Sequence, residues 1–366
     1  MIVCHVKAAL SSYEIEIKRE SDLNAVKGLG SKFVIVTDNL VAITHGKSIQ
    51  QKLMSMGLEV ELLSFPAGEE NKTRQTKELL ENQMFEKDLG RDTCLIALGG
   101  GVVSDIGGFL AATYCRGIPF VIMPTTLLGM VDASIGGKSG VNVPYGKNLV
   151  GAICSPNRVI IQLSFLKTLP LVQLRSGVVE MIKHGLIANK EHFLDLQKSS
   201  KEVLECDLDV LERIIPASIA IKVEIVERDA KEGGIRNLLN FGHTVGHALE
   251  LITKFSISHG EAVAIGILTE SYLSMQLGMM QKGTFDMIRA IFKQYGLPLW
   301  LPKKYDCMEV LNAMILDKKS LKGKPRFTLL KEVAEPLSAS GAYCSSVDEL
   351  VLKKTIEWMI DDLCCY

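Results

Sequence analysis

The stretch Thr93-Cys-Leu-Ile-Ala-Leu-Gly-Gly-Gly-Val-Val-Ser-Asp105 runs from an apolar segment through three glycines into an apolar helical pattern. The segment 93–98 has the length and composition of a buried strand. Glycines at the start of a helix let the backbone approach a phosphate, and the helix N-terminus offers free N–H groups. The stretch therefore predicts a strand, turn and helix that can cradle a pyrophosphate. A tight turn that binds nothing would need the same glycines. The dinucleotide pattern G-x-G-x-x-G/A also requires Gly or Ala at its third conserved position, where this chain has Ser104.

Similar units lie on both sides of this stretch. Short apolar runs at 33–37, 60–65 and 119–124 alternate with helical patterns near 45–56 and 74–88. This alternation predicts a parallel sheet with helices on both faces, and residues 2–18 predict a strand pair at its edge. Ligands of such sheets bind beyond the carboxyl ends of the strands. We therefore expect Asp38, Gly99–Gly101 and Thr125-Thr126 to lie along one edge.

The pattern changes near Leu169-Pro170, where we place a domain boundary between residues 1–169 and 170–366. The second part is mainly helical. We expect helices near 172–188, 191–204, 208–230, 236–253, 259–277 and 284–295, a late strand at 326–330 and a terminal helix. The chain thus predicts an α/β domain followed by an all-α domain.

Three of the seven histidines fall in Asn240-Phe-Gly-His-Thr-Val-Gly-His-Ala-Leu-Glu250 and the nearby His259-Gly-Glu261. If the first segment is helical, His243 and His247 project from one face, as paired zinc ligands often do. An isolated pair of this spacing is more often packed or exposed. A catalytic zinc needs a third protein ligand and an open position. Glu180, on an apolar helical pattern, is a candidate for that ligand, although a surface ion pair with Lys183 would explain it too.

Composition excludes several classes of partner. The 366 residues are 47% hydrophobic and 23% charged, with a net charge of −1, so the whole chain has no general attraction to nucleic acid or membranes. An anionic ligand must therefore be bound by a local cluster. The glycine-flanked Lys138 and Lys147 are candidates for loop-borne cations, against the alternative of a solvated loop. Nine cysteines without C-x-x-C spacing, and no apolar run of membrane-spanning length, predict a cytoplasmic protein.

The ordered set of motifs resembles the 3-dehydroquinate synthases over about residues 33 to 330. The matching pieces include GEENKT (68–73), ALGGGVVSD (97–105), VDASIGGKSG (131–140), YGKNLVGA (145–152), RSGVVEMIKHG (175–185), EGGIRNLLNFGHTVGHALE (232–250) and HGEAVAIG (259–266). The family has Gly where this chain has Ser104. The resemblance implies a Rossmann-like NAD-binding domain at 1–169 and a helical metal- and substrate-binding domain at 170–366, similar in fold to glycerol dehydrogenases and iron-type alcohol dehydrogenases.

The resemblance also implies site residues. The metal ligands would be Glu180, His243 and His259, with His247 facing the substrate instead. The residues that would bind NAD are Asp38, Glu69, Lys72, Gly100, Gly101, Asp105, Thr125, Thr126, Lys147 and Thr168. The catalytic residues would be Lys138, Asn148, Lys183, Arg236, Asn240 and His247, and the other substrate contacts Arg116, Asp132, Lys222 and Lys318 or Lys319.

The implied reaction belongs to aromatic amino-acid biosynthesis by the shikimate pathway. A homodimer would convert 3-deoxy-D-arabino-heptulosonate 7-phosphate, an anionic sugar phosphate, to 3-dehydroquinate and phosphate with NAD⁺ and Zn²⁺ or Co²⁺. Asp38 and Glu69 would repel a 2′-phosphate and so favour NAD over NADP. The alternatives are a sister cyclase that makes 2-deoxy-scyllo-inosose or an epi-valiolone, a metal-dependent polyol dehydrogenase, and an inactive homologue that acts as a binding protein.

Overall fold

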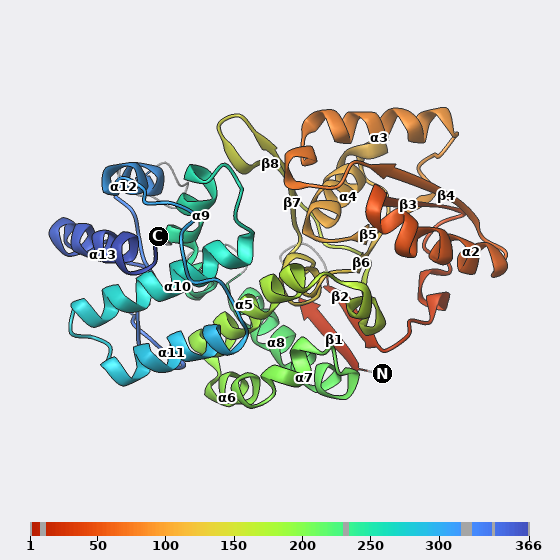
Figure 1. Ribbon diagram of the computed structural model, residues 1–366. Helices are drawn as coiled ribbons and strands as arrows, with labels where there is room; N and C mark the ends of the chain where they lie inside the picture. The colour runs from red at the N-terminus through yellow and green to blue at the C-terminus, as the bar shows by residue number, and fades with distance from the viewer. Residues whose placement is uncertain (1, 8–11, 230–233, 316–323, 339–340, 365–366) are drawn as a thin grey trace. The chain divides into compact units, whose positions relative to one another are not determined.

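The computed structural model describes residues 2–7, 12–229, 234–315, 324–338 and 341–364 (Figure 1). The chain divides into two compact units, Met1–Leu169 and Pro170–Tyr366. Each unit is described by itself below. No helix in the described ranges is both long enough and apolar enough to cross a membrane.

The first unit is built on a seven-stranded sheet with the strand order β1-β2-β9-β6-β5-β3-β4. The strands are β1 (Ile2–Lys7), β2 (Ser12–Lys18), β3 (Lys32–Asp38), β4 (Glu59–Phe65), β5 (Thr93–Gly99), β6 (Phe120–Pro124) and β9 (Arg158–Gln162). All neighbours are parallel except β1 and β2, which form an antiparallel pair at the edge. The predicted parallel sheet and edge pair are confirmed.

Helices cover both faces of this sheet. They are α1 (Asn39–Val41), a π-helical turn (Ala42–Gly46), α2 (Lys47–Ser55), α3 (Arg74–Glu86) and α4 (Gly101–Thr113). The crossover from β3 to β4 runs one way across the sheet, and those from β4 to β5 and from β5 to β6 run the other way. Because such crossovers are right-handed, α2 lies on one face, and α3 and α4 share the other, where they pack together. Burial on both faces explains the unbroken apolar runs of β3 and β5.

The strand order reverses at β3. The chain moves outward from β3 to β4 and then returns to β5 on the other side of β3. Asp38 ends β3, and Gly99 ends β5. These two residues therefore flank the switch point where doubly wound sheets bind ligands.

Some parts of this unit differ from the prediction. Lys138 and Lys147 lie on an antiparallel hairpin of β7 (Lys138–Val143) and β8 (Gly146–Ile153), where we expected a loop. The hairpin is rich in glycine and polar residues, so it lacks the apolar alternation of a strand. Strand β9 was not predicted either, and the helix expected at 45–56 begins earlier, at Asn39.

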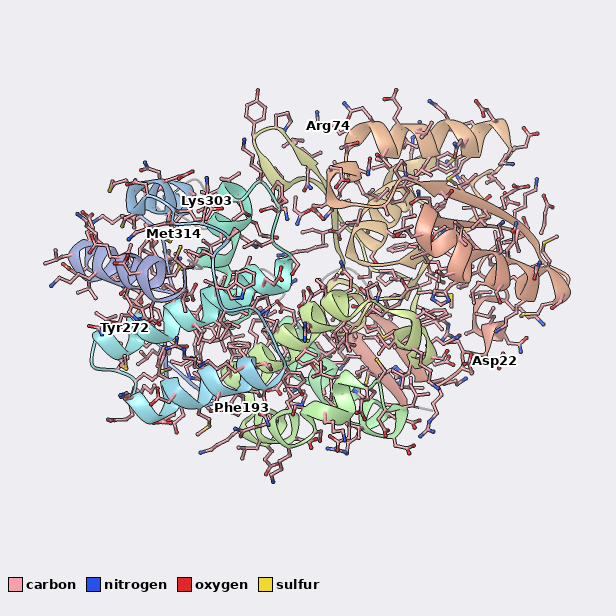
Figure 2. All side chains as sticks on the ribbon, in the orientation of Figure 1. Asp22, Arg74, Phe193, Tyr272, Lys303 and Met314 are labelled. Carbon is pink, nitrogen blue, oxygen red and sulfur yellow. The ribbon has the colours of Figure 1, made fainter. Side chains whose placement is uncertain are left out.

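The second unit is mainly helical. Its helices are α5 (Leu171–Ala188), α6 (Lys190–Lys198), α7 (Ser200–Leu204), α8 (Leu208–Arg228), the 3-10 helix η7 (Ile235–Asn240), α9 (His243–Ile252), α10 (His259–Gln276), α11 (Lys282–Gln294), α12 (Cys307–Ile315) and α13 (Glu349–Asp362). Helix α10 is central and packs against α5, α9, α11 and α13. Apolar side chains from α9, α10, α12 and α13, among them Met314, fill the core (Figure 2).

Two predictions for this unit were wrong in detail. The helix expected at 236–253 is interrupted, because η7 ends at Asn240 and α9 begins at His243. Gly242, between them, has φ +79°, and a Cβ there would lie 2.4 Å from Ile267 Cγ1. The late strand begins at Leu330 and not at Arg326, and β10 (Leu330–Glu332) pairs with β11 (Glu335–Pro336).

Candidate active site

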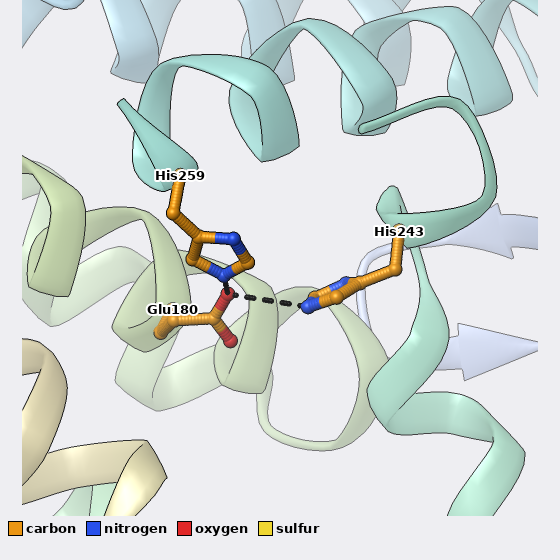
Figure 3. A group of neighbouring side chains, drawn as sticks. All are labelled: Glu180, His243 and His259. Atoms are coloured by element: carbon orange, nitrogen blue, oxygen red, sulfur yellow. Dashed lines mark ion pairs between the residues drawn. The ribbon is translucent and has the colours of Figure 1, made fainter. Parts of the chain in front are cut away.

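Three side chains of the second unit converge on one point (Figure 3). Glu180 is fully buried in the middle of α5, and His243 and His259 are the first residues of α9 and α10. The Nε2 atom of each histidine lies 3.6 Å from Glu180 Oε1. One donor atom from each of the three residues lies within 4.8 Å of the others, which suits a single metal ion. The group that converges is thus the set implied by the resemblance, and not the pair His243 and His247.

Local sequence features bring these helices together. Ser258 caps α10 through a capping box with Glu261, which fixes the helix start at His259. The next residue is Gly260, where a Cβ would lie 2.3 Å from Ser176 Cα on α5. Only glycine therefore allows α10 to approach α5 one turn before Glu180.

The second nitrogen of each histidine also has an acceptor. His259 Nδ1 lies 3.4 Å from Glu250 Oε1, and His243 Nδ1 lies 3.1 Å from the carbonyl oxygen of Phe241. Glu250 is 3% exposed, so its carboxylate is held inside the unit. A proton on Nδ1 of each ring leaves the Nε2 lone pair directed towards the metal position, as in most metal-bound histidines.

The electrostatics of the cluster favour a cation. Burial lowers the pKa of His259, but hydrogen bonds to Glu180 and Glu250, together with their charges, outweigh this and raise the pKa to about 10. The buried carboxylates therefore stabilise positive charge at this position, whether on a proton or on a metal ion that displaces it. Two imidazoles and one carboxylate are a donor set that suits Zn²⁺ and leaves coordination positions open.

Buried cations surround the same helices. Lys183 is 1% exposed, forms an ion pair with Glu180 and donates a hydrogen bond of 2.8 Å to the carbonyl oxygen of Leu239. Lys222 on α8 and Arg236 on η7 are also buried, and η7 packs against both α5 and α8. These helices therefore carry three buried basic side chains, Lys183, Lys222 and Arg236.

Two further predicted residues of this unit, Asn240 and His247, lie close to His243 in the chain. Asn240 ends η7, and the ring of His247 lies 5.3 Å from that of His243, centroid to centroid. Lys318 and Lys319 lie outside the described residues.

The first unit brings its predicted residues to the switch-point edge. Asp38 Oδ1 accepts hydrogen bonds of 2.9 Å from the backbone N–H groups of Leu40 and Val41. Gly100 is the N-cap residue of α4, and it has no side chain that could accept a hydrogen bond from the first N–H groups of the helix. Thr125 and Thr126 follow β6 directly. This arrangement suits a pyrophosphate at the helix N-terminus.

Ser104, where the resemblance leads us to expect glycine, is accommodated in this turn. Its hydroxyl donates a hydrogen bond of 3.2 Å to the carbonyl oxygen of Gly100. The side chain is 2% exposed. The serine hydroxyl therefore bonds within the first turn of α4.

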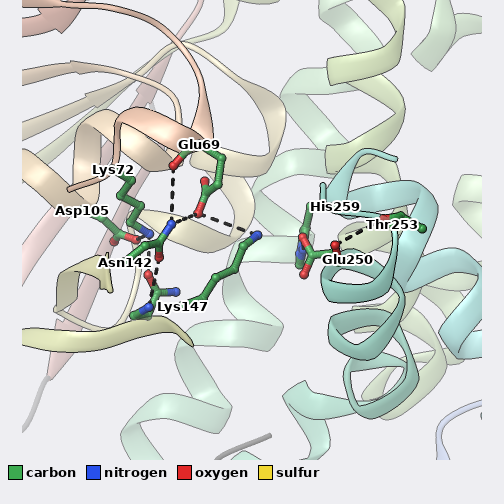
Figure 4. A network of polar contacts seen from close by, with 9 residues as sticks. Glu69, Lys72, Asp105, Asn142, Lys147, Glu250, Thr253 and His259 are labelled. Carbon is green, nitrogen blue, oxygen red and sulfur yellow. Dashed lines mark hydrogen bonds and ion pairs between the residues drawn. The ribbon is translucent and has the colours of Figure 1, made fainter. Parts of the chain in front are cut away.

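A polar network joins other predicted residues of the same unit (Figure 4). Lys72 pairs with Asp105 and donates a hydrogen bond of 2.6 Å to Asn148 Oδ1. Burial raises the pKa of Asp105, and the charge of Lys72 opposes that shift. Glu69 Oε1 accepts a hydrogen bond of 2.8 Å from Asn142 and lies 3.7 Å from Lys147 Nζ.

Sequence reasoning missed two residues of this unit. Asn142 links Glu69 to the hairpin, and His45 Nε2 lies 2.9 Å from Thr168 Oγ1. Neither residue lies in a recognisable motif. The contacts of each depend on strand pairing or helix placement, which a single sequence does not show.

Backbone strain marks two predicted substrate residues of the first unit. Arg116 has φ +65° and Asn148 has φ +53°, in a region that residues other than glycine seldom adopt. Six other non-glycine residues among the described ones share this conformation. Asp132 lies in a π-helical turn (Gly129–Ala133), and Lys138 begins β7.

Comparison with known proteins fits this description. Residues 62–176 and 177–320 match the 3-dehydroquinate synthase N-terminal and C-terminal families. A 3-dehydroquinate synthase from Pelobacter propionicus is 40% identical over 302 residues, which cover 82% of this chain and 84% of that protein.

Two solved structures share the fold. One is 2-deoxy-scyllo-inosose synthase complexed with carbaglucose-6-phosphate, NAD⁺ and Co²⁺, with a TM-score of 0.89 and 24% identity over 97% of this chain and 99% of that one. The other is 2-epi-5-epi-valiolone synthase from Streptomyces hygroscopicus with NAD⁺ and Zn²⁺, with a TM-score of 0.87 and 25% identity over 99% of this chain and 100% of that one.

The parallel-sheet unit, the helical unit and the carboxylate–histidine cluster together define a protein with the fold of the sugar phosphate cyclases. Within that class, the chain belongs to the 3-dehydroquinate synthase family.

Proposed function

We propose that the protein converts 3-deoxy-D-arabino-heptulosonate 7-phosphate to 3-dehydroquinate and phosphate. The observation that carries the proposal is the convergence of Glu180, His243 and His259 in a chain of this family. The identity of 40% to a 3-dehydroquinate synthase favours this substrate over those of the sister cyclases, whose identities are 24% and 25%.

The two sites suit two cofactors. When bound, NAD⁺ would accept a hydride from a secondary alcohol and return it later, and a divalent zinc or cobalt ion would polarise the reacting oxygens as a Lewis acid. Asp38, the Gly99–Gly101 turn and the Glu69–Lys72 network support NAD binding by the first unit. Glu180, His243 and His259 support metal binding by the second.

The cationic side chains have a role that a simple dehydrogenase does not need. The substrate carries a carboxylate and a phosphate, and fixed cations bind both groups by charge-assisted hydrogen bonds. Lys183, Lys222 and Arg236 are buried and so keep fixed positions. We assign Arg116, Lys138 and Asn148 of the first unit to the same substrate.

We assign His247 a role in phosphate elimination. The β-elimination removes a proton next to the new ketone while the C–O bond to phosphate breaks. We propose that the departing phosphate accepts this proton and that His247 donates a hydrogen bond to the phosphate. The imidazole is suited to this because its ring lies beside His243 but its donor atoms are not part of the metal-binding group.

The test is phosphate release from 3-deoxy-D-arabino-heptulosonate 7-phosphate, with and without NAD⁺ and with and without a chelator. We expect release that needs both NAD⁺ and metal and leaves no net NADH. Lasting NADH would assign the protein to the polyol dehydrogenases. No turnover by protein that holds zinc and NAD would favour a sister cyclase, and sugar phosphates without a carboxylate would then be tried.

Two finer features belong to the same proposal. We expect NAD to bind more tightly than NADP, because Asp38 and Glu69 would face a 2′-phosphate. We also expect a homodimer, which light scattering on the purified protein would test.

A further inference from the structure

The second unit contains a cavity of about 360 Å³ that no metal ligand lines. Its walls come from the start of α5, the N-terminus of α10, and the end of α11 with the segment after it. Helices α5 and α11 both pack against α10 (Figure 1). The volume lies at the lower end of the range for small-molecule sites.

Two cationic side chains line the cavity. Arg175 and Lys293 line it, and neither forms an ion pair within the described residues. Arg175 Nε donates a hydrogen bond of 2.9 Å to the carbonyl oxygen of Tyr295, which orients the guanidinium. A Cβ at Gly296 would lie 2.5 Å from Arg175 Nη2, so the glycine leaves room for this orientation.

The carboxylate at this cavity is already engaged. Glu261 accepts a hydrogen bond of 2.7 Å from the backbone N–H of Ser258 in the capping box of α10. The N-terminus of α10, where Ser258 and Glu261 line the cavity, adds partial positive charge. The two cations and the helix end therefore favour a ligand with negative charge, of the kind that the planar fork of Arg binds best.

Apolar residues line the cavity too. They are Leu297, Pro298 and Trp300, and Trp300 has 49% of its surface exposed. An indole ring offers a flat surface for stacking, and half-exposed tryptophans are common at binding sites. A ligand that fits these lining residues carries an acidic group and a flat apolar body.

We propose that this cavity binds a small aromatic carboxylate, with the carboxylate at Arg175 and Lys293 and the ring against Trp300. The residues that line this cavity include none of the three metal ligands and none of the residues assigned to the substrate. Binding here is therefore tested separately from the reaction that the protein catalyses.

Tryptophan fluorescence tests the proposal directly. The chain has two tryptophans, and Trp358 stacks on Tyr272 with ring centroids 3.8 Å apart. In the full-length W358F variant, Trp300 is the only fluorescent indole. We expect 3-phenylpropionate to change its emission saturably at millimolar concentrations or below, and the uncharged 3-phenylpropionamide to bind about tenfold more weakly, because it lacks the charge-assisted hydrogen bonds.

Substitutions at the cations provide the matched comparison. K293M, on the W358F background, should weaken 3-phenylpropionate binding about tenfold. K282M, at the other end of α11, should leave it unchanged. R175M should weaken binding further. If R175M fails to fold, the affinity of K293M for 3-phenylpropionate, measured by titration calorimetry, still tests the proposal.

Four results would overturn the proposal. They are no saturable change up to tens of millimolar, equal binding of acid and amide, binding that K293M leaves unaltered, and displacement of the acid by inorganic phosphate at equal concentration. The last result would assign the cavity to simple anions. Phosphate release by the W358F variant, measured in parallel, reports on the proposed function alone.

Discussion

The two candidate sites are built by different means. In the first unit, the residues lie at the ends of neighbouring strands, and sheet topology alone brings Asp38 next to the Gly99–Gly101 turn. In the second unit, three ligands come from three helices, and close helix packing brings them together.

The sites also differ in how they treat charge. The polar network of the first unit is neutralised internally, since Lys72 pairs with Asp105 and Lys147 lies near Glu69. The second unit buries the Glu180 carboxylate beside two imidazoles and a lysine. Buried charge is costly unless it is fully paired. We therefore expect the second site to depend on its bound metal ion far more than the first site depends on its bound NAD.

The largest effect should come from the metal ligands. His243→Ala or His259→Ala removes one of three donors. We expect zinc to be lost and turnover to fall about a thousandfold, because a Lewis acid supplies several kcal/mol of transition-state stabilisation and each 1.4 kcal/mol is tenfold. Zinc content by atomic absorption and phosphate release would be measured together.

His247→Gln is the matched control for those variants. It changes a neighbouring imidazole, so zinc content should stay at the wild-type level while phosphate release slows about 10²-fold, the lower end of the usual contribution of acid–base groups. Loss of zinc from this variant would show that the role assigned to His247 is wrong.

The sequence predicted much of the first site and less of the second, for physical reasons. The ends of buried strands are marked by apolar runs, so the positions of Asp38 and Thr125 follow from periodicity. The spacing of His243 and His247 suggested a shared metal, but the choice of His259 depends on the contact of Gly260 with α5. No local pattern encodes that contact, and only the resemblance pointed to Glu180 and His259 together.

Acid should destabilise the second unit through a histidine away from the metal ligands. His192, on α6, is 4% exposed, and burial lowers its pKa from 6.5 to about 4. The unfolded chain therefore binds a proton that the folded chain excludes, and stability present above pH 6.5 is lost as the pH falls towards 4. The loss is on the order of 3 kcal/mol, since each pKa unit corresponds to about 1.4 kcal/mol.

Urea unfolding at pH 7 and pH 4.5 would measure this effect. His192→Phe removes the titrating group, so its loss of stability between the two pH values should be smaller than that of the wild type. An equal loss in both proteins would mean that His192 is protonated without unfolding.

A smaller effect is expected from a change of Glu250, which accepts a hydrogen bond from His259 Nδ1. Glu250→Gln should weaken zinc binding about 10- to 100-fold, as is usual when the partner of a metal-bound histidine is changed. Competition with a chromophoric chelator would measure the affinity in the absence of substrate. Glu261→Gln, which changes the cap of the same helix but no imidazole contact, should alter it less, and equal effects would contradict the role of Glu250.

The smallest effect distinguishes binding from folding in the first unit. Asp38 both caps a helix, through Oδ1, and is proposed to bind the ribose of NAD. Asn caps helices about as well as Asp but carries no charge, so Asp38→Asn should keep the melting temperature while the preference for NAD over NADP falls about tenfold. Asp38→Ala loses both roles and should also cost about 1 kcal/mol of stability. If Asp38→Asn lowered stability as much as Asp38→Ala and left the cofactor preference intact, the role of Asp38 would be helix capping and not NAD binding. The residues of the first site could then not be changed without changing the stability of the fold.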